Sequence, residues 1–165
     1  MKKKLLHYIK ETLFFILFIT LFANAISFYK STELNKESLS LQKVQLIDGS
    51  FEFFDAKKPI IIHFWATWCP TCKLEAQNIE YLSHHYNVLS IAVNSGSDEA
   101  IKKYMKEHSL TFKVINDQHS IYAKEFHIAA YPTTFIYDQN KNLVFSEVGY
   151  TSTIGLFLRM LWLSL

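Results

Sequence analysis

The sequence predicts a single α/β domain with a mixed sheet, preceded by one N-terminal helix. Strand-like and helix-like segments alternate through the middle of the chain, a pattern that favours parallel strand pairing. Two further strand-like runs and a closing helical segment follow, which adds a hairpin to that sheet. The 165 residues amount to about one domain, and 50% hydrophobic with 16% aromatic residues can fill a core. This composition excludes disorder for most of the chain.

The N-terminus carries an uncharged apolar run behind a basic tail. Residues 12–29 are just long enough to span a bilayer. Lysines crowd the N-terminal side, so everything after residue 29 is expected on the extracytoplasmic side. A cleaved signal peptide is the alternative, because Ala23-Asn24-Ala25 matches the small-x-small cleavage pattern. The expected division is a cytoplasmic tail at 1–11, an anchor or signal peptide at 12–29, a polar tether at 30–41 and the domain at 42–165.

The domain is expected to open with a hairpin. Residues 44–47 and 51–54 are short apolar segments around Asp48-Gly49, a common turn dipeptide. Residues 60–66 form a nearly continuous apolar run, typical of a central strand covered on both faces. A helix should follow over 69–85, which lacks glycine and begins at a pair of cysteines.

The remaining elements follow from the same patterns. Apolar runs predict strands, and segments with helix-start residues or helical spacing predict helices. The expected strands are 88–93, 112–115, 133–137 and 143–148, and the expected helices are 97–108, 120–126 and 153–165. The last helix, with its apolar stretch 154–165, is too short to span a membrane; we expect it to pack on the core, with a membrane-surface contact as the alternative.

The net charge of +2 is too small for the clustered basic face of a nucleic-acid-binding protein, so no nucleic-acid partner is expected.

The chain has two cysteines, Cys69 and Cys72, and they are its most informative candidates for chemistry. At a helix start the two are i and i+3 neighbours, within reach of a disulfide. The helix N-terminus favours the thiolate of Cys69, which predicts Cys69 as nucleophile and Cys72 as resolving thiol. Pro70 suits the first helical turn, where its missing N–H costs nothing.

Other uses of the cysteine pair are weighed against this one. A zinc site would need two more ligands, and the adjacent His84 and His85 do not have the usual three-to-five-residue spacing. Covalent haem attachment requires a histidine directly after Cys72, where the chain has Lys73. A purely structural disulfide remains open, although so small a loop constrains the unfolded chain little.

Two segments resemble the thioredoxin superfamily. Residues 64–72 read Phe-Trp-Ala-Thr-Trp-Cys-Pro-Thr-Cys, and residues 131–135 read Tyr-Pro-Thr-Thr-Phe. The resemblance covers about residues 41–165. It is closest to the membrane-anchored TlpA-like branch, which includes suppressor-of-copper-sensitivity and cytochrome-maturation types. The N-terminal apolar run, the leading hairpin, Glu75 and residues 114–117 (Val-Ile-Asn-Asp) fit that branch.

The resemblance implies a thioredoxin-like fold and thiol:disulfide exchange on protein substrates. This exchange would be carried out by a redox-active disulfide between Cys69 and Cys72, without a bound cofactor. It implies a cis peptide bond before Pro132, facing the cysteines, which a proline opening a strand also suggests. The residues expected to contact the partner chain are Trp68, Pro70, Thr71, Tyr131 and Thr133. It further implies a membrane electron donor and a domain on the periplasmic side of a bacterial inner membrane.

Direction and function class stay open at this point. Reduction of protein disulfides is favoured by resemblance, because compartment alone does not determine the direction of exchange. A disulfide-forming oxidant of the same fold is the enzymatic alternative. A copper-binding or thiol-sequestering module, using Cys69 and Cys72 as ligands without turnover, is the alternative of another class.

Two residues near the motif depart from, or add to, the thioredoxin pattern. His63 stands where thioredoxins carry a buried aspartate, and it is expected either to act as a base with pKa near neutrality or to be a core histidine. Glu75 is expected to face water on the helix, or otherwise to tune Cys72 by charge repulsion.

Overall fold

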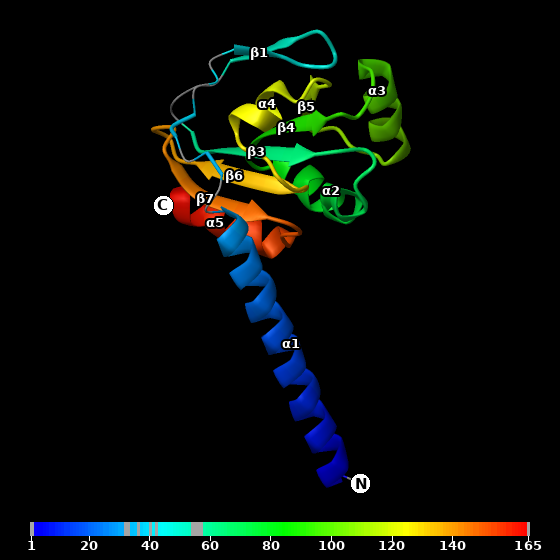
Figure 1. The fold of residues 1–165 in the computed structure, drawn as a ribbon, viewed down its shortest axis with the longest axis vertical. Coiled ribbons are helices and arrows are strands. Elements are labelled where there is room, and N and C mark those ends of the chain that lie inside the picture. Colours follow the sequence, from blue (N-terminus) through cyan, green and yellow to red (C-terminus); the bar gives the residue numbers. More distant parts are fainter. Residues whose placement is uncertain are drawn as a thin grey trace.

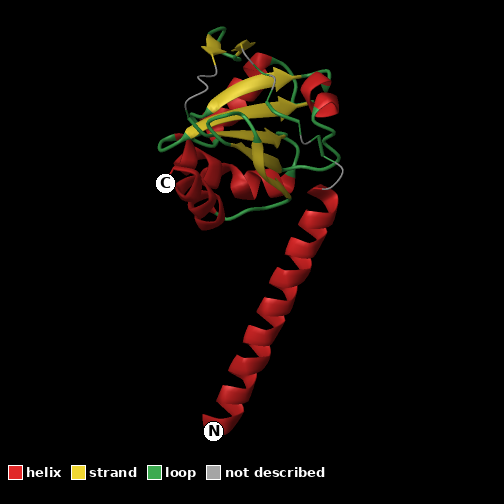
Figure 2. Cartoon of the chain, turned by 90° about the vertical axis from the view of Figure 1, so that its left-hand side faces the viewer, coloured by secondary structure: helices red, strands yellow, loops and turns green. Residues whose placement is uncertain are grey.

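A computed structural model describes residues 2–31, 34–35, 37–39, 41, 43–53 and 58–164. A long helix, α1 (Lys2–Ser31), projects from one end of an α/β domain (Figures 1 and 2). The predicted order of strands and helices in the domain is confirmed. Residues 54 and 165, at the ends of a predicted strand and of the closing helix, lie outside the described residues, as does residue 1 of the tail.

A five-stranded mixed sheet forms the centre of the domain, in the order β5-β4-β3-β6-β7. Its strands are β3 (Ile60–Trp65), β4 (Asn87–Val93), β5 (Lys113–Asp117), β6 (Thr133–Tyr137) and β7 (Leu143–Val148). β3 pairs in parallel with β4, which pairs in parallel with β5; β6 joins β3 antiparallel, and β7 joins β6 antiparallel. Every residue of β3 is buried, as expected for a central strand covered on both faces.

Helices cover both faces of this sheet. They are α2 (Pro70–Ser83), α3 (Asp98–Glu107), α4 (Ile121–Glu125) and α5 (Thr153–Ser164). Because successive side chains of a strand point to opposite faces, Ile61 and Trp65 of β3 enter one core cluster, while Ile62 and Phe64 enter the other. The first cluster contains the cysteine pair and residues of α2, α3 and α5; the second lies under α4.

The leading hairpin is present but pairs only with itself. β1 (Lys43–Gln45) and β2 (Phe51–Phe53) form a separate two-stranded antiparallel sheet. Gly49 has a φ of +88°, a conformation that glycine adopts without steric cost, and its N–H donates to the Leu46 carbonyl at 2.9 Å. The Ile47 N–H donates to the Val114 carbonyl of β5 at 3.0 Å, which attaches the hairpin to the domain.

The described residues between α1 and β1 do not form the free tether expected for 30–41. Leu34, Leu39 and Leu41 are buried in the second core cluster. The Leu39 N–H donates to the Lys141 carbonyl at 3.0 Å, and the Asn35 N–H donates to the Phe126 carbonyl at 3.3 Å. The segment packs on the domain because its leucines bury apolar surface. The polar residues between these leucines led to the prediction of a tether.

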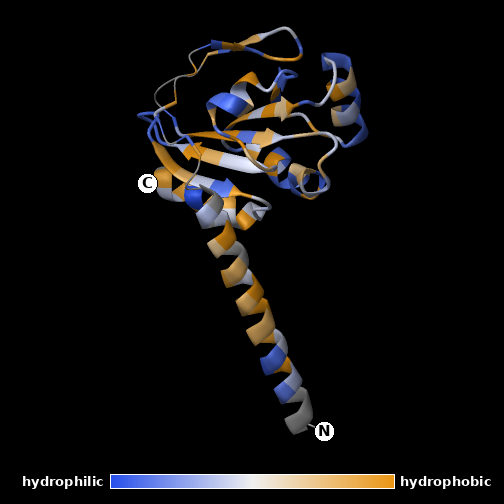
Figure 3. Ribbon diagram, in the orientation of Figure 1, coloured by the Kyte–Doolittle hydropathy of each residue, from blue (hydrophilic) through white to orange (hydrophobic). Residues whose placement is uncertain are grey.

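The N-terminal helix has one stretch, His7–Ser27, that is long and apolar enough to cross a membrane. It begins and ends somewhat earlier than the predicted 12–29. Figure 3 shows a predominantly apolar band along α1, with hydrophilic residues toward its N-terminal end. Near its other end α1 contacts β7: the Ser27 hydroxyl accepts the Val148 N–H at 3.0 Å.

Candidate active site

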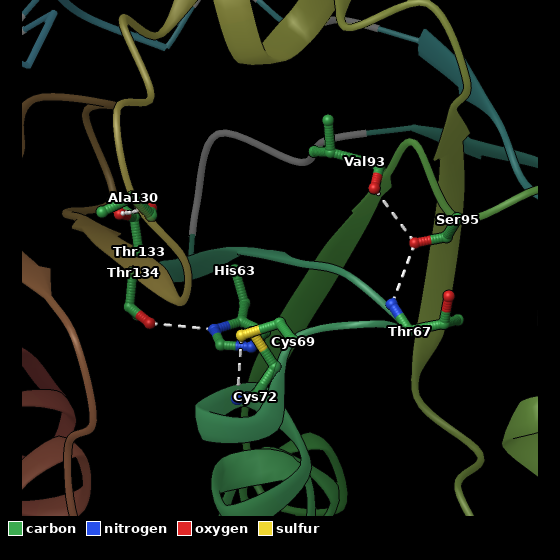
Figure 4. Close-up of a disulfide and its surroundings, with 9 residues drawn as sticks. All are labelled: His63, Thr67, Cys69, Cys72, Val93, Ser95, Ala130, Thr133 and Thr134. Carbon is green, nitrogen blue, oxygen red and sulfur yellow. Dashed lines mark hydrogen bonds between the residues drawn. A yellow bond between two sulfur atoms is a disulfide. The ribbon is translucent and has the colours of Figure 1, made fainter.

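The cysteine pair lies where β3 passes into α2. Cys69 is the N-cap of α2, and its sulfur accepts the Cys72 backbone N–H at 3.1 Å. The two cysteines form a disulfide, with their Cα atoms 5.2 Å apart, and both are buried (Figure 4). Pro70 occupies the first helical position and is exposed, and Thr71 is partly buried. This arrangement directs the unpaired N–H groups and the positive end of α2 at the Cys69 sulfur, which favours its thiolate over that of Cys72.

A serine that the sequence analysis did not single out holds the loop before Cys69. The Ser95 hydroxyl accepts the Thr67 N–H at 3.0 Å and donates to the Val93 carbonyl at 3.1 Å (Figure 4). Ser95 lies just beyond β4, next to the parallel strand β3. Its position after an apolar run was the available signal, because the carboxyl ends of parallel strands meet at one edge of the sheet.

Trp68 and Tyr131 join the two segments on which the resemblance rests. Their rings pack edge to face with centroids 5.7 Å apart. The Trp68 indole N–H donates to the Asn94 carbonyl at 3.1 Å, yet 58% of the residue is exposed. An anchored but exposed aromatic ring beside the cysteines offers an apolar surface to a partner chain. Trp65, by contrast, is buried in the core.

The peptide bond between Tyr131 and Pro132 is cis, as the resemblance implies. Pro132 is buried, and its carbonyl accepts the Gly149 N–H at 2.8 Å. Thr133 is buried as well, and its hydroxyl donates to the Ala130 carbonyl at 2.8 Å (Figure 4). These bonds fix the turn into β6, and the packing of Tyr131 on Trp68 connects that turn to the residue before Cys69.

His63 is a buried core histidine on the same face of β3 as Trp65. Its Nδ1 lies 2.9 Å from the Thr134 hydroxyl on the neighbouring strand, and its ring lies in the surroundings of the disulfide (Figure 4). Burial lowers its pKa to about 3, because the charged imidazolium would lose its hydration. Burial therefore favours the core histidine over a base with a pKa near neutrality, because His63 stays neutral in the range where thiols react.

Glu75 is fully buried, which corrects the expectation that it faces water. It follows Cys72 by three residues and therefore shares its face of α2. Its Oε1 accepts the Thr151 N–H at 3.0 Å, and its Oε2 is buried without a hydrogen-bond partner among the described residues. Burial raises the pKa of Glu75 to about 8, and the negative charge of Glu147 adds to the rise.

The histidines considered for a zinc site lie elsewhere. His84 is paired with Glu80 at 3.0 Å near the C-terminal end of α2, whereas the cysteines lie at its N-terminal end. Within the part of the chain that the structure describes, no three His, Cys, Asp or Glu side chains gather as metal ligands would.

Comparison with known proteins agrees with this geometry. Residues 33–146 match the AhpC/TSA family. The chain is 32% identical over 130 residues to a thioredoxin-like protein of Haemophilus influenzae, covering 78% of this chain and 75% of that protein. It is 28% identical to the thiol-disulfide oxidoreductase ResA of Bacillus cereus, covering 76% of this chain and 75% of ResA.

Among solved structures, StoA from Bacillus subtilis superimposes with a TM-score of 0.63 at 22% identity. The match covers 74% of this chain and 96% of StoA, which confirms the thioredoxin-like fold. Fold, cysteine pair, cis proline and sequence similarity agree. The chain therefore belongs to the AhpC/TSA family, as a thioredoxin-like thiol–disulfide oxidoreductase.

Proposed function

We propose that this protein reduces disulfides in extracytoplasmic proteins through Cys69 and Cys72. The observation that carries the proposal is the position of the Cys69 sulfur at the N-terminus of α2, next to Trp68, on whose ring Tyr131 of the cis Tyr131–Pro132 bond packs. A thiolate is the attacking species in disulfide exchange, and this position favours it. Trp68 and the backbone around Pro132 supply the surface on which a partner chain rests.

The exchange takes two steps. The Cys69 thiolate attacks one sulfur of the substrate disulfide, forms a mixed disulfide and expels the other substrate sulfur as a thiolate. The Cys72 thiolate then attacks the Cys69 sulfur and releases the second substrate sulfur, which leaves the Cys69–Cys72 disulfide. Two electrons pass to the substrate, and the two cysteine sulfurs carry them without a cofactor. A membrane dithiol donor must return two electrons for the next cycle.

Glu75 is proposed to set when Cys72 becomes reactive. While protonated, its buried carboxyl presents no charge to Cys72; once ionised, it repels the Cys72 thiolate. In a Cys69→Ser background, Glu75→Gln should therefore speed alkylation of Cys72 several-fold at pH 9 and leave the rate at pH 6 unchanged. Equal rates for both proteins at both pH values would remove Glu75 from the mechanism.

The location proposed is the bacterial inner membrane, with α1 as an uncleaved anchor and the domain on the periplasmic side. The apolar stretch His7–Ser27 and the lysines before it support this orientation. Alkaline carbonate extraction of membranes tests the anchor: the protein should stay in the pellet. A soluble mature protein beginning at Ile26 would show instead that the N-terminus is a signal peptide.

The direction of exchange is tested by the redox state of the pair in cells. Acid quenching, alkylation with a mass-tagged maleimide and gel separation should show a mainly reduced pair. A mainly oxidised pair would identify a disulfide-forming oxidant. Insulin reduction by the purified protein, with Cys69→Ser as control, tests turnover; tight stoichiometric Cu(I) binding without turnover would favour the binding module.

A further inference from the structure

Helix α5 has two apolar faces, only one of which the domain covers. Leu156 and Met160 are buried in the core cluster that contains the cysteines. On the outer side, four large apolar residues are 41–72% exposed: Ile154, Leu158, Leu161 and Trp162. Their spacing of four, three and one residues places them on one stripe of the helix. An amphipathic surface helix normally carries polar residues on its outer side, so this stripe calls for a partner.

Helix α5 is linked to the end of α1 through strand β7. Ser27, the last residue of the candidate membrane span, accepts the Val148 N–H of β7 at 3.0 Å, and its hydroxyl lies 3.4 Å from the Glu147 carboxylate. The same carboxylate forms an ion pair with Arg159 of α5. Glu147 thus connects the end of the span directly to α5. Figures 1 and 2 both place α5 at the end of the domain from which α1 emerges.

We infer that the outer stripe of α5 lies on the surface of the same bilayer that α1 is proposed to span. This inference rests on the proposed anchor, because the end of an embedded span marks the level of the lipid headgroups. Residues one side chain away from Ser27 are then at that level too. The stripe would then contact lipid at the boundary between headgroups and acyl chains.

The composition of α5 suits that boundary. It contains no acidic residue, and its one charged residue, Arg159, is half-buried and neutralised by Glu147. Trp162, 63% exposed, packs edge to face on Phe145 of β7 with centroids 5.8 Å apart, which holds its indole in place. Tryptophan is enriched at membrane–water interfaces because its ring is both apolar and polar. Helices with such a face lie in the plane of the interface.

The test uses the full chain in phosphatidylcholine nanodiscs, with one chain per disc. Replacing the lipid with one brominated at the upper acyl carbons should quench part of the tryptophan emission. That part should disappear in Trp162→Phe, which keeps the aromatic contact with Phe145, since Trp65 is buried and Trp68 lies at the disulfide. Leu158→Ser should weaken the quenching at least twofold, and the matched control Ile121→Ser, 64% exposed on α4, should not.

Two failures are distinguishable. A chain that does not co-elute with the discs overturns the anchor and this inference together. A chain that co-elutes, but whose quenching is the same with and without Trp162, overturns this inference and leaves the anchor standing. Quenching that is absent with one chain per disc, while α5 cross-links between chains at two per disc, would assign the stripe to a second copy instead.

Discussion

Two buried ionisable side chains near the disulfide have pKa values shifted in opposite directions by the same cause. Burial disfavours the charged form, so it lowers the pKa of His63 to about 3 and raises that of Glu75 to about 8. Both groups are therefore neutral at pH 7. Of the two, Glu75 is the one that changes charge in the range where thiols ionise.

The raised pKa of Glu75 should make the fold less stable as pH rises. Between about pH 4.5 and 8 the unfolded chain loses the Glu75 proton while the folded chain keeps it, so the free energy of unfolding falls with pH in that window. Glu75→Gln should remove up to roughly 1.4 kcal/mol of this loss per pH unit. Urea titrations at pH 5 and pH 8 measure it. The control Glu107→Gln, exposed on α3, should behave as wild type; an unchanged slope in Glu75→Gln contradicts the assignment.

The lowered pKa of His63 predicts the opposite pH dependence, a loss of stability as pH falls. As pH falls from about 6.5 to about 3, the unfolded chain takes up a proton that the folded chain does not, so stability is lost in acid. His63→Asn should flatten the decline of the melting temperature between pH 7 and pH 4, and His119→Asn, at an exposed position, should not. Cys72 reactivity above pH 5 should be the same in His63→Asn; a changed profile would restore His63 as a base.

At the residue scale the sequence identifies sulfur chemistry but not the environment of its neighbours. Spacing alone places Cys69 and Cys72 at a helix start, because that pattern is local. The buried Glu75 carboxyl accepts the N–H of Thr151, which lies 76 positions later in the chain. A contact between residues so far apart leaves no trace in the helical pattern around Glu75.

At the scale of elements, periodicity predicts strands and helices well because each element buries a repeated apolar pattern. It fails for the segment between α1 and β1. Its three leucines are spread over eight mostly polar positions and follow neither the helical nor the strand period. Leu34, Leu39 and Leu41 are nevertheless all buried in the core. Irregular segments of this kind are stabilised by tertiary packing, which a local pattern does not report.

Truncating one of these leucines tests the packing. Leu39→Ala should lower the free energy of unfolding by about 2–4 kcal/mol, the usual cost of a buried leucine. Ser38→Ala, at the exposed neighbouring position, should change it by less than about 0.5 kcal/mol. Urea unfolding of the detergent-solubilised chain gives both values. Two equally small effects would mean that this stretch behaves as a free tether.

For the whole molecule, the order of elements and the position of the cysteines follow from the sequence, whereas the docking of α1 does not. Ser27 and Glu147 are 120 positions apart, and neither has a neighbour pattern that predicts the contact. For α5, the sequence offered core packing and a membrane-surface contact as alternatives. The structure shows that one apolar face, with Leu156 and Met160, is buried in the core and that a second apolar face stays exposed.

The proposed orientation predicts the labelling of intact spheroplasts. The chain has only two cysteines, so labelling is unambiguous. After mild reduction, a membrane-impermeant maleimide should modify Cys69 and Cys72 without lysis, because the domain faces outward. The Cys69→Ser/Cys72→Ser double variant should remain unlabelled. Labelling that requires lysis would place the domain in the cytoplasm.

The packing of Leu34, Leu39 and Leu41 has a consequence for how partners are met. A free linker of about 12 residues would let the domain drift on the order of 20 Å from its anchor. Because these three leucines pack on the domain, such a drift is restricted, and an α1 embedded as proposed would hold the disulfide at a nearly constant distance from the membrane. Under the proposed anchoring, the protein would meet its substrates by a two-dimensional search within the plane of the membrane, and it would select them by the height of their disulfides above that plane.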